Sequence, residues 1–516
     1  MEKARRGVFQ RFLDGVEYLG NKLPHPVTLF AILALAVLAL SAIISATGVS
    51  VEHPGEEGEM VEVSNLLNAE GIQYIFESMV DNFIGFAPLG VVLATMLGIG
   101  LAERTGLISA CLRGFVLSVP KKLVTLGLVF AGIMSSVASD AGYVVLPPLG
   151  AVIFAALGRH PLAGLAAAFA GVSAGFSANL FLSATDPMLG ELTIDAASVV
   201  DPAYAEGMNI AMNYYFIFAS VFLLTFVGAW VTERIVEPRL GKYTGEYTED
   251  LKGLDTIEKK GLIAAGITLL IGLIATALLI VPPNAIMRGE DGSIVQSPFM
   301  SSLVPIIALL FFIPGLVYGK VTKSIRNDKD VAEQLSDTMA SMGMFIVLAF
   351  TAGQFVAYFT ESNMGLVLGV FGAQFLESIN LSGIPLIIMF ILVAGFINLF
   401  IGSASAKWAM MAPVFVPIMM QLGYSPELTQ MAYRVADSAT NIITPLMTYF
   451  AIIIAFAQKY DKKMGIGTLI SVMFPYSIVF LISWTIFLIL WMSLGSLDFL
   501  PFEPNLGPGS PIHYEK

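Results

Sequence analysis

Five charged residues lie inside long apolar stretches of this 516-residue sequence: Asp140, Asp186, Lys407, Arg434 and Asp437. On membrane-insertion scales, an Asp, Lys or Arg at the centre of a helix costs roughly 2.5–3.5 kcal/mol. An ion pair with a purely structural role would explain some of these charges. All five, however, lie in four short polar segments, 135–143, 171–187, 398–408 and 434–445. This clustering favours a binding or ion-coupling site.

The spacing within the last segment points to a shared surface. Arg434, Asp437 and Asn441 lie at i, i+3 and i+7, which places them on one face of a helix. The serines and glycines nearby are ambiguous, because small residues also allow membrane helices to pack closely. Pro445 is expected to stop or kink this helix and so to free backbone carbonyls.

A similar stripe occurs earlier in the chain. Asn179, Ser183 and Asp186 share a face if their helix stays regular, and Pro187 is expected to end or kink that helix.

These side chains are suited to two kinds of ligand. Arg434 can hold a carboxylate bidentately, and Trp408 can stack on an aromatic ring or a cation. Asp186 or Asp437 can load and release a proton if burial favours its neutral form. Hard oxygen donors suit Na⁺ equally well, and the candidate Na⁺ ligands are Ser135, Ser136, Asp140, Asn179, Ser403 and Asn441.

The composition excludes a soluble protein. Only 13% of residues are charged and 56% are apolar, whereas soluble domains carry about 25% charged residues. The apolar stretches are continuous and about 20 residues long, as in membrane-spanning helices and unlike the alternating strands of a barrel. The fold class is therefore an all-α polytopic membrane protein.

The sequence carries no enzyme signature and implies no cofactor. The histidines have no metal or triad spacing, and no phosphate-binding loop of the ATPase type is present. Cys111 is the only cysteine, so an intrachain disulfide is impossible. The net charge of −12 lies mainly in acidic loops, and no basic patch suits nucleic acid.

The basic residues predict the topology, because lysine and arginine concentrate on the cytoplasmic side. Placing 23 of the 27 in cytoplasmic loops gives nine crossings, with the N-terminus inside and the C-terminus outside. The first crossing is an uncleaved helix. The predicted crossings are 27–47, 76–101, 161–184, 211–232, 261–282, 299–319, 341–359, 428–457 and 466–494.

Two further apolar regions do not fit as crossings, because each has both ends on one side. We interpret 123–157 and 384–422 as re-entrant hairpins, the first from the cytoplasm and the second from outside. The stretch 364–375 is too short to span and is expected at the outer interface.

The two hairpin regions also resemble each other. At an offset of 265 residues, the difference between Pro161 and Pro426, several identical residues coincide. This predicts an inverted repeat within a single transporter domain covering 1–516, as in secondary transporters. Half one covers about 76–232, with hairpin 123–157 and broken helix 161–187. Half two covers about 341–494, with hairpin 384–422 and broken helix 428–457. The remaining helices would form a scaffold.

Three motifs resemble the p-aminobenzoyl-glutamate transporter (AbgT) family, within the wider group of ion-coupled elevator transporters. They are SATDP at 183–187, GSASAKWAMMAPVFVPIM at 402–419 and YRVADSATNIITPL at 433–446. The resemblance extends over nearly the whole chain. The resemblance implies that the residues matching the family's functionally important positions are Asp186, Asn398, Ser405, Trp408, Pro426, Arg434, Asp437 and Pro445. From the residues alone, Pro426 would be interpreted as a helix-start proline.

The resemblance implies a homodimer in the bacterial inner membrane that moves p-aminobenzoyl-glutamate or related aromatic acids with Na⁺ or H⁺. It also implies that some members export sulfonamide-type antimetabolites, so the direction of transport stays open. The alternatives are a dicarboxylate-type Na⁺ symporter of the same superfamily, a channel or receptor, and a membrane-embedded hydrolase. A channel would carry repeated rings of pore-lining groups, and a hydrolase would need a nucleophile–base pair.

Overall fold

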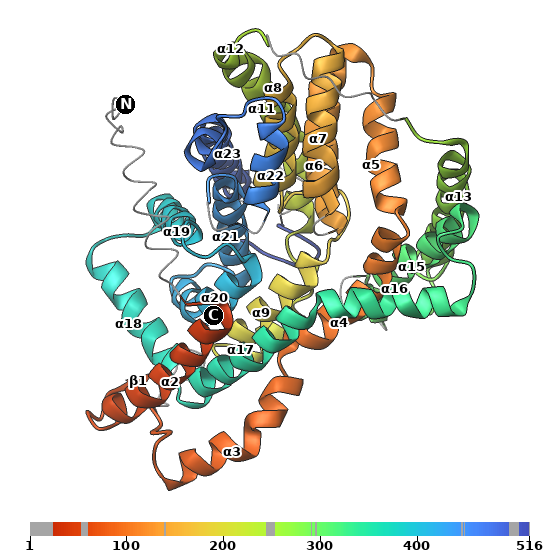
Figure 1. Cartoon of the computed structure of the whole chain (residues 1–516). Helices are drawn as coiled ribbons and strands as arrows, with labels where there is room; N and C mark the ends of the chain where they lie inside the picture. Colours follow the sequence, from red (N-terminus) through yellow and green to blue (C-terminus); the bar gives the residue numbers. More distant parts are fainter. Residues whose placement is uncertain are drawn as a thin grey trace.

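A computed structural model describes residues 24–52, 60–138, 141–243, 253–289, 292–294, 297–444, 447, 449–494 and 505–514. Asp140 and Pro445, both predicted site residues, lie outside these ranges. The described chain is almost entirely helical (Figure 1). Its two strands, β1 (Ser50–Glu52) and β2 (Met60–Glu62), form a small antiparallel pair in which Val51 faces Val61. The all-α prediction is confirmed.

Among the described residues, seven helical segments are long and apolar enough to cross a membrane. The seven include α3–α4 and α11–α12 as composite segments, and each overlaps a crossing predicted from the sequence. They are α2 (Pro26–Ser45), α3 with α4 (Ala69–Ile84, Ala87–Arg104), α11 with η4 and α12 (Tyr214–Val231, Thr232–Val236, Glu237–Leu240), α13 (Thr256–Leu278), α15 (Leu303–Thr322), α17 (Gly343–Glu361) and α23 (Ile466–Leu494).

The other two predicted crossings are interrupted helices. Helix α8 (Pro161–Phe169) continues through a π-helical turn, η3 (Ala170–Ala174), after which residues 175–184 are irregular. Helix α21 (Pro426–Asn441) is likewise separated from α22 (Phe450–Gln458). Because neither forms a continuous span, the count of nine crossings stays a prediction.

The irregular segment corrects two details of the sequence interpretation. Asn179 and Ser183 do not share a helix face with Asp186, because the helix ends at Ala174, before all three. Pro187 does not end that helix either. It lies in the first turn of the next helix, α9 (Thr185–Ser198), where a missing backbone N–H costs little.

Both predicted hairpin regions contain helical arms. The first consists of η1 (Lys121–Leu123), α6 (Val124–Met134), η2 (Ser135–Ala138) and α7 (Ala141–Ala156), and segment 121–137 bends by 113° from α5 (Leu107–Ser118). The second consists of α19 (Gly383–Asn398) and α20 (Ala404–Gln421).

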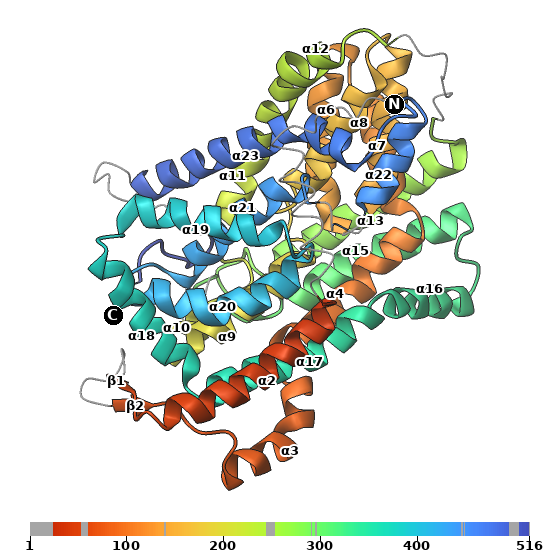
Figure 2. The same cartoon turned by 60° about the vertical axis from the view of Figure 1, so that its left-hand side comes forward.

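The arms of each hairpin pack against the interrupted helix that follows. Helices α6 and α7 contact α8, and α19 and α20 contact α21 (Figures 1 and 2). Both interrupted helices begin with a capping side chain and a proline, His160–Pro161 and Ser425–Pro426. This correspondence supports the predicted repeat, which stays a prediction.

The remaining helices surround these units. Helix α15 packs between α4 and α13, and α17 lies along α2 (Figure 2). Most of α13 is exposed apolar surface, which suits lipid or another protein surface. The other helices are α10 (Pro202–Gly207), α14 (Pro298–Ser301), α16 (Asp328–Ser341) and α18 (Met364–Ser378).

The first hairpin is held by direct backbone contact. A Cβ atom at Gly164 of α8 would lie 2.1 Å from the carbonyl oxygen of Gly150 on α7, and one at Gly150 would lie 2.5 Å from the carbonyl oxygen of Gly164. Small residues allow membrane helices to approach this closely.

Substitution Gly164→Ala is therefore expected to force α7 and α8 apart and to destabilise the protein by about 1–3 kcal/mol. The measurement is the thermal unfolding of detergent-purified protein. The matched control is Gly266→Ala on α13, where an added Cβ meets nothing within 4 Å. Equal melting temperatures for the two variants would contradict the contact.

Candidate substrate and ion site

Helix α21 forms the centre of the site, and every one of its residues is buried. It begins at Pro426, after the Ser425 hydroxyl accepts a hydrogen bond from Leu428 N. Pro426 therefore occupies the helix-start position expected from the residues alone. It lies about 22 Å along the helix axis from Asn441 and thus outside the polar cluster described below.

One ion pair joins α21 to the start of α9. Arg434 Nη1 lies 2.7 Å from Asp186 Oδ1, and both side chains are almost fully buried. The other Asp186 oxygen accepts hydrogen bonds from Ser183 N (2.5 Å) and Ser183 Oγ (2.9 Å). Within the described part of the chain, Arg434 Nε has no hydrogen-bond partner. The guanidinium thus keeps a buried donor for an anion.

A second ion pair joins α21 to the second hairpin. Lys407 Nζ lies 2.5 Å from Asp437 Oδ1, and the lysine is completely buried. It also donates to the side-chain oxygen of Asn398 and to the carbonyl oxygen of Ile401 (3.2 Å). Asn441 Nδ2 donates to Asp437 Oδ2 at 3.4 Å. The structure therefore brings Asn398, Asp437 and Asn441 together around a lysine.

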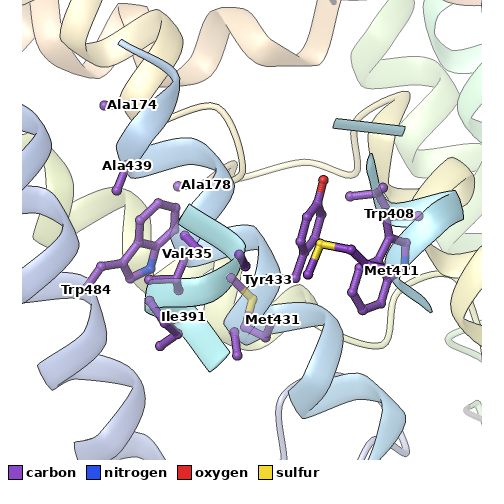
Figure 3. Packing of buried hydrophobic residues seen from close by; sticks show 14 of the residues in the cluster. Ala174, Ala178, Ile391, Trp408, Met411, Met431, Tyr433, Val435, Ala439 and Trp484 are labelled. Atoms are coloured by element: carbon purple, nitrogen blue, oxygen red, sulfur yellow. The ribbon is translucent and has the colours of Figure 1, made fainter. Parts of the chain in front are cut away.

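Trp408 is enclosed by protein. Its ring stacks on Tyr433, with 4.6 Å between ring centroids and 27° between planes, and Met411 lies close by (Figure 3). Its Nε1 donates to Thr193 Oγ1 at 2.9 Å. Since the side chain is fully buried, the predicted ligand-stacking face is covered in this conformation.

The first hairpin supplies a smaller polar contact. Asn179 Nδ2 donates to Ser136 Oγ at 2.9 Å, and this links the irregular segment to the hairpin tip. Ser135 Oγ instead donates to Gly132 O of its own turn (2.6 Å). Of the predicted Na⁺ ligands in this half, Ser136 and Asn179 are therefore brought together.

The serines of the second hairpin tip interact mainly with each other. Ser403 Oγ lies 3.3 Å from Ser405 Oγ and accepts a hydrogen bond from Ala406 N, which caps α20. Among the described residues, neither serine forms a hydrogen bond with Asp437 or Arg434.

Sequence reasoning missed a buried polar network beside Trp408. Gln430 Nε2 donates to Thr193 Oγ1 (2.8 Å), and Asn213 Nδ2 donates to Gln430 Oε1 (2.8 Å). One signal was available: Gln430 lies four residues before Arg434, on the same helix face. Thr193 and Asn213 gave no such signal, because Thr193 lies between two predicted crossings, Asn213 lies near the start of the crossing 211–232, and neither side chain is charged.

Comparison with known proteins was made for the whole chain. The family model for AbgT transporters matches residues 11–514. The chain belongs to the AbgT transporter family. It is 40% identical over 494 residues to the p-aminobenzoyl-glutamate transport protein of Escherichia coli K12, with 96% of each chain covered.

Two solved structures agree with this AbgT-family assignment. The YdaH transporter of Alcanivorax borkumensis has a TM-score of 0.88 and 43% identity, and covers 94% of this chain and all of its own. MtrF of Neisseria gonorrhoeae, described as illuminating a class of antimetabolite efflux pumps, has a TM-score of 0.89 and 48% identity. It covers 97% of this chain and all of its own. The predicted resemblance, the multi-pass membrane fold and the transporter class are thus confirmed, and the protein is not an enzyme.

Two cavities of this AbgT-family transporter contact the segments that precede and follow Asp186 in the chain. One, of about 640 Å³, is lined by Glu191 and Ile194 of α9, among others. The other, of about 840 Å³, contacts Phe181 and Leu182 of the irregular segment and is largely apolar. Neither is lined by Arg434 or Lys407, in agreement with the burial of both.

Proposed function

We propose that the protein is a secondary active transporter for p-aminobenzoyl-glutamate or related aromatic carboxylates, including antimetabolites of the sulfonamide type. In this proposal it works as a homodimer in the bacterial inner membrane, coupled to Na⁺ or H⁺, with its N-terminus in the cytoplasm and its C-terminus outside. The family relationship supports the substrate class, since the E. coli relative is a p-aminobenzoyl-glutamate transport protein.

The observation that carries the proposal is the buried guanidinium of Arg434 with its unpartnered Nε. A guanidinium has five donors in a fork that matches a carboxylate. The single Asp186 contact leaves part of this fork available. A carboxylate arriving here would find a positive partner in a buried environment, where the interaction is stronger than in water.

The largely apolar cavity of about 840 Å³ supports an aromatic substrate. Its volume falls within the range of about 300–1,000 Å³ that is typical of small-ligand sites. Aromatic side chains contribute to its lining, among them Phe181, Tyr214 and Phe311. In this proposal the aromatic ring of the substrate binds in this cavity. A movement of the irregular segment 175–184 then exposes Arg434 to the carboxylate of the substrate.

The test is transport of labelled p-aminobenzoyl-glutamate and of a sulfonamide in proteoliposomes, with Na⁺ and pH gradients imposed separately. We expect saturable movement that responds to one of the two gradients. Movement that responds to neither would rule out coupled transport, and flux without saturation would indicate a channel. Transport of succinate but not of aromatic acids would favour the dicarboxylate symporter.

A further inference from the structure

Lys407 has no role in the proposed binding of substrate, although it is completely buried. It lies in the first turn of α20, just after the tip of the second hairpin. An isolated charge in such a place is costly, and removing the partner of a buried pair costs about 3–5 kcal/mol. The surroundings of its ammonium group indicate what that group does.

Three oxygen atoms from three parts of the fold surround Lys407 Nζ. Asn398 at the end of α19 supplies its side-chain oxygen, Ile401 in the hairpin tip its carbonyl, and Asp437 in the middle of α21 a carboxylate oxygen. One anionic and two neutral oxygens form a donor set that suits a hard monovalent cation. The ammonium therefore occupies a position where Na⁺ would find ligands.

The orientation of the Asn398 side-chain oxygen is fixed by contacts that do not involve the lysine. Asn398 Nδ2 donates to Asp437 O (2.7 Å), Thr440 Oγ1 (2.7 Å) and Asn441 Oδ1 (2.9 Å). Because the amide nitrogen is held by three acceptors, the amide oxygen must face the other way, toward Lys407. The Thr444 hydroxyl also donates to Asn398 O at 3.2 Å. The Asn398 oxygen would thus keep its orientation without the lysine.

The first hairpin has no equivalent of this lysine. At the offset of 265 residues, Gly142 corresponds to Lys407. A Cβ atom at Gly142 would lie 2.0 Å from Ser135 Oγ, so a side chain there would require Ser135 to move. The polar contact in that half is instead the direct hydrogen bond between Asn179 and Ser136.

We propose that the Lys407 ammonium is a tethered substitute for a metal cation in the second hairpin, so that Na⁺ does not bind among Asn398, Ile401 and Asp437. This proposal replaces the prediction of Na⁺ near Ser403 and Asn441 in this half, because the lysine fills the cation position. If the protein transports its substrate with Na⁺, as proposed above, the coupling Na⁺ binds in the first half, near Ser136 and Asn179. This second statement rests on the proposed transport function.

The test is to open the site by Lys407→Ala and to measure melting temperature in NaCl and in choline chloride at pH 8, with purified full-length protein. We expect NaCl to raise the melting temperature of the variant by about 2 °C more than that of the wild type. In Lys407→Ala with Asp437→Asn, this added response should disappear, because the anionic ligand is gone. The matched control is Lys260→Ala on α13, an exposed lysine.

Two results would overturn the proposal: a variant with no Na⁺ response beyond that of the wild type, or a response that survives Asp437→Asn. If Lys407→Ala does not fold, Lys407→Met is measured in the same way, since its side chain keeps most of the packing volume. The assay needs no substrate. A wild-type protein that fails to transport aromatic acids would therefore refute the proposed function and leave this site assignment standing.

Discussion

Substitution Arg434→Ala is expected to abolish transport and to destabilise the protein by about 3–5 kcal/mol. The reason is the 2.7 Å ion pair with Asp186, in which both side chains are buried. Without the guanidinium, the Asp186 carboxylate keeps its hydrogen bonds from Ser183 but loses its counter-charge. Transport in proteoliposomes and thermal unfolding in detergent measure the two effects separately.

A paired substitution separates the role of Arg434 in stability from its role in binding. Asp186→Asn together with Arg434→Gln removes both charges, so no buried charge is left alone. Such a neutral pair is expected to recover at least about 2 kcal/mol relative to Arg434→Ala. Transport should stay absent, because the carboxylate-binding fork is missing. Near-wild-type transport by the neutral pair would refute the assignment of Arg434 to substrate.

Substitution Trp408→Ala should cost about 3–5 kcal/mol, because it removes a large, fully buried side chain. Trp408→Phe should cost only about 1–2 kcal/mol, because phenylalanine still stacks on Tyr433 while the hydrogen bond to Thr193 and part of the buried ring are lost. Thermal unfolding of the two variants gives these differences.

Transport kinetics then test whether the indole also touches the substrate. In the structure its ring packs against Tyr433 and is covered, so we expect Trp408→Phe to leave KM unchanged. A tenfold rise in KM with an unchanged melting temperature would show that the indole contacts the ligand directly during the cycle. Met492→Leu, near the end of α23, serves as a control for a conservative substitution outside the contacts of Trp408.

The spans could be predicted because long apolar runs end at basic residues. Helix α23 covers the predicted residues 466–494, and α17 begins and ends within two residues of the prediction 341–359. The end of α8 was placed too late. The polar segment 171–187 indicated a break, but the helix ends at Ala174, where η3 packs against α6 of the first hairpin, and the sequence pattern does not show that contact.

The pairing of the buried charges could not be predicted from the sequence either, because it also depends on how the helices pack. Arg434 and Asp437 lie three residues apart on one helix, a spacing that allows an ion pair between them. In the structure, Arg434 instead contacts Asp186 and Asp437 contacts Lys407, each on another element. Those partners are chosen by how α9 and α20 pack against α21, over separations of many residues.

The two ion pairs have an electrical consequence. Lys407 and Arg434 balance Asp186 and Asp437, so these four side chains together carry no net charge. Moving one elementary charge through a membrane potential of 100 mV is worth about 2.3 kcal/mol. A displacement of the four as a unit therefore does no work against the potential. Voltage would then act on a transport cycle mainly through the charges of the substrate and its coupling ion.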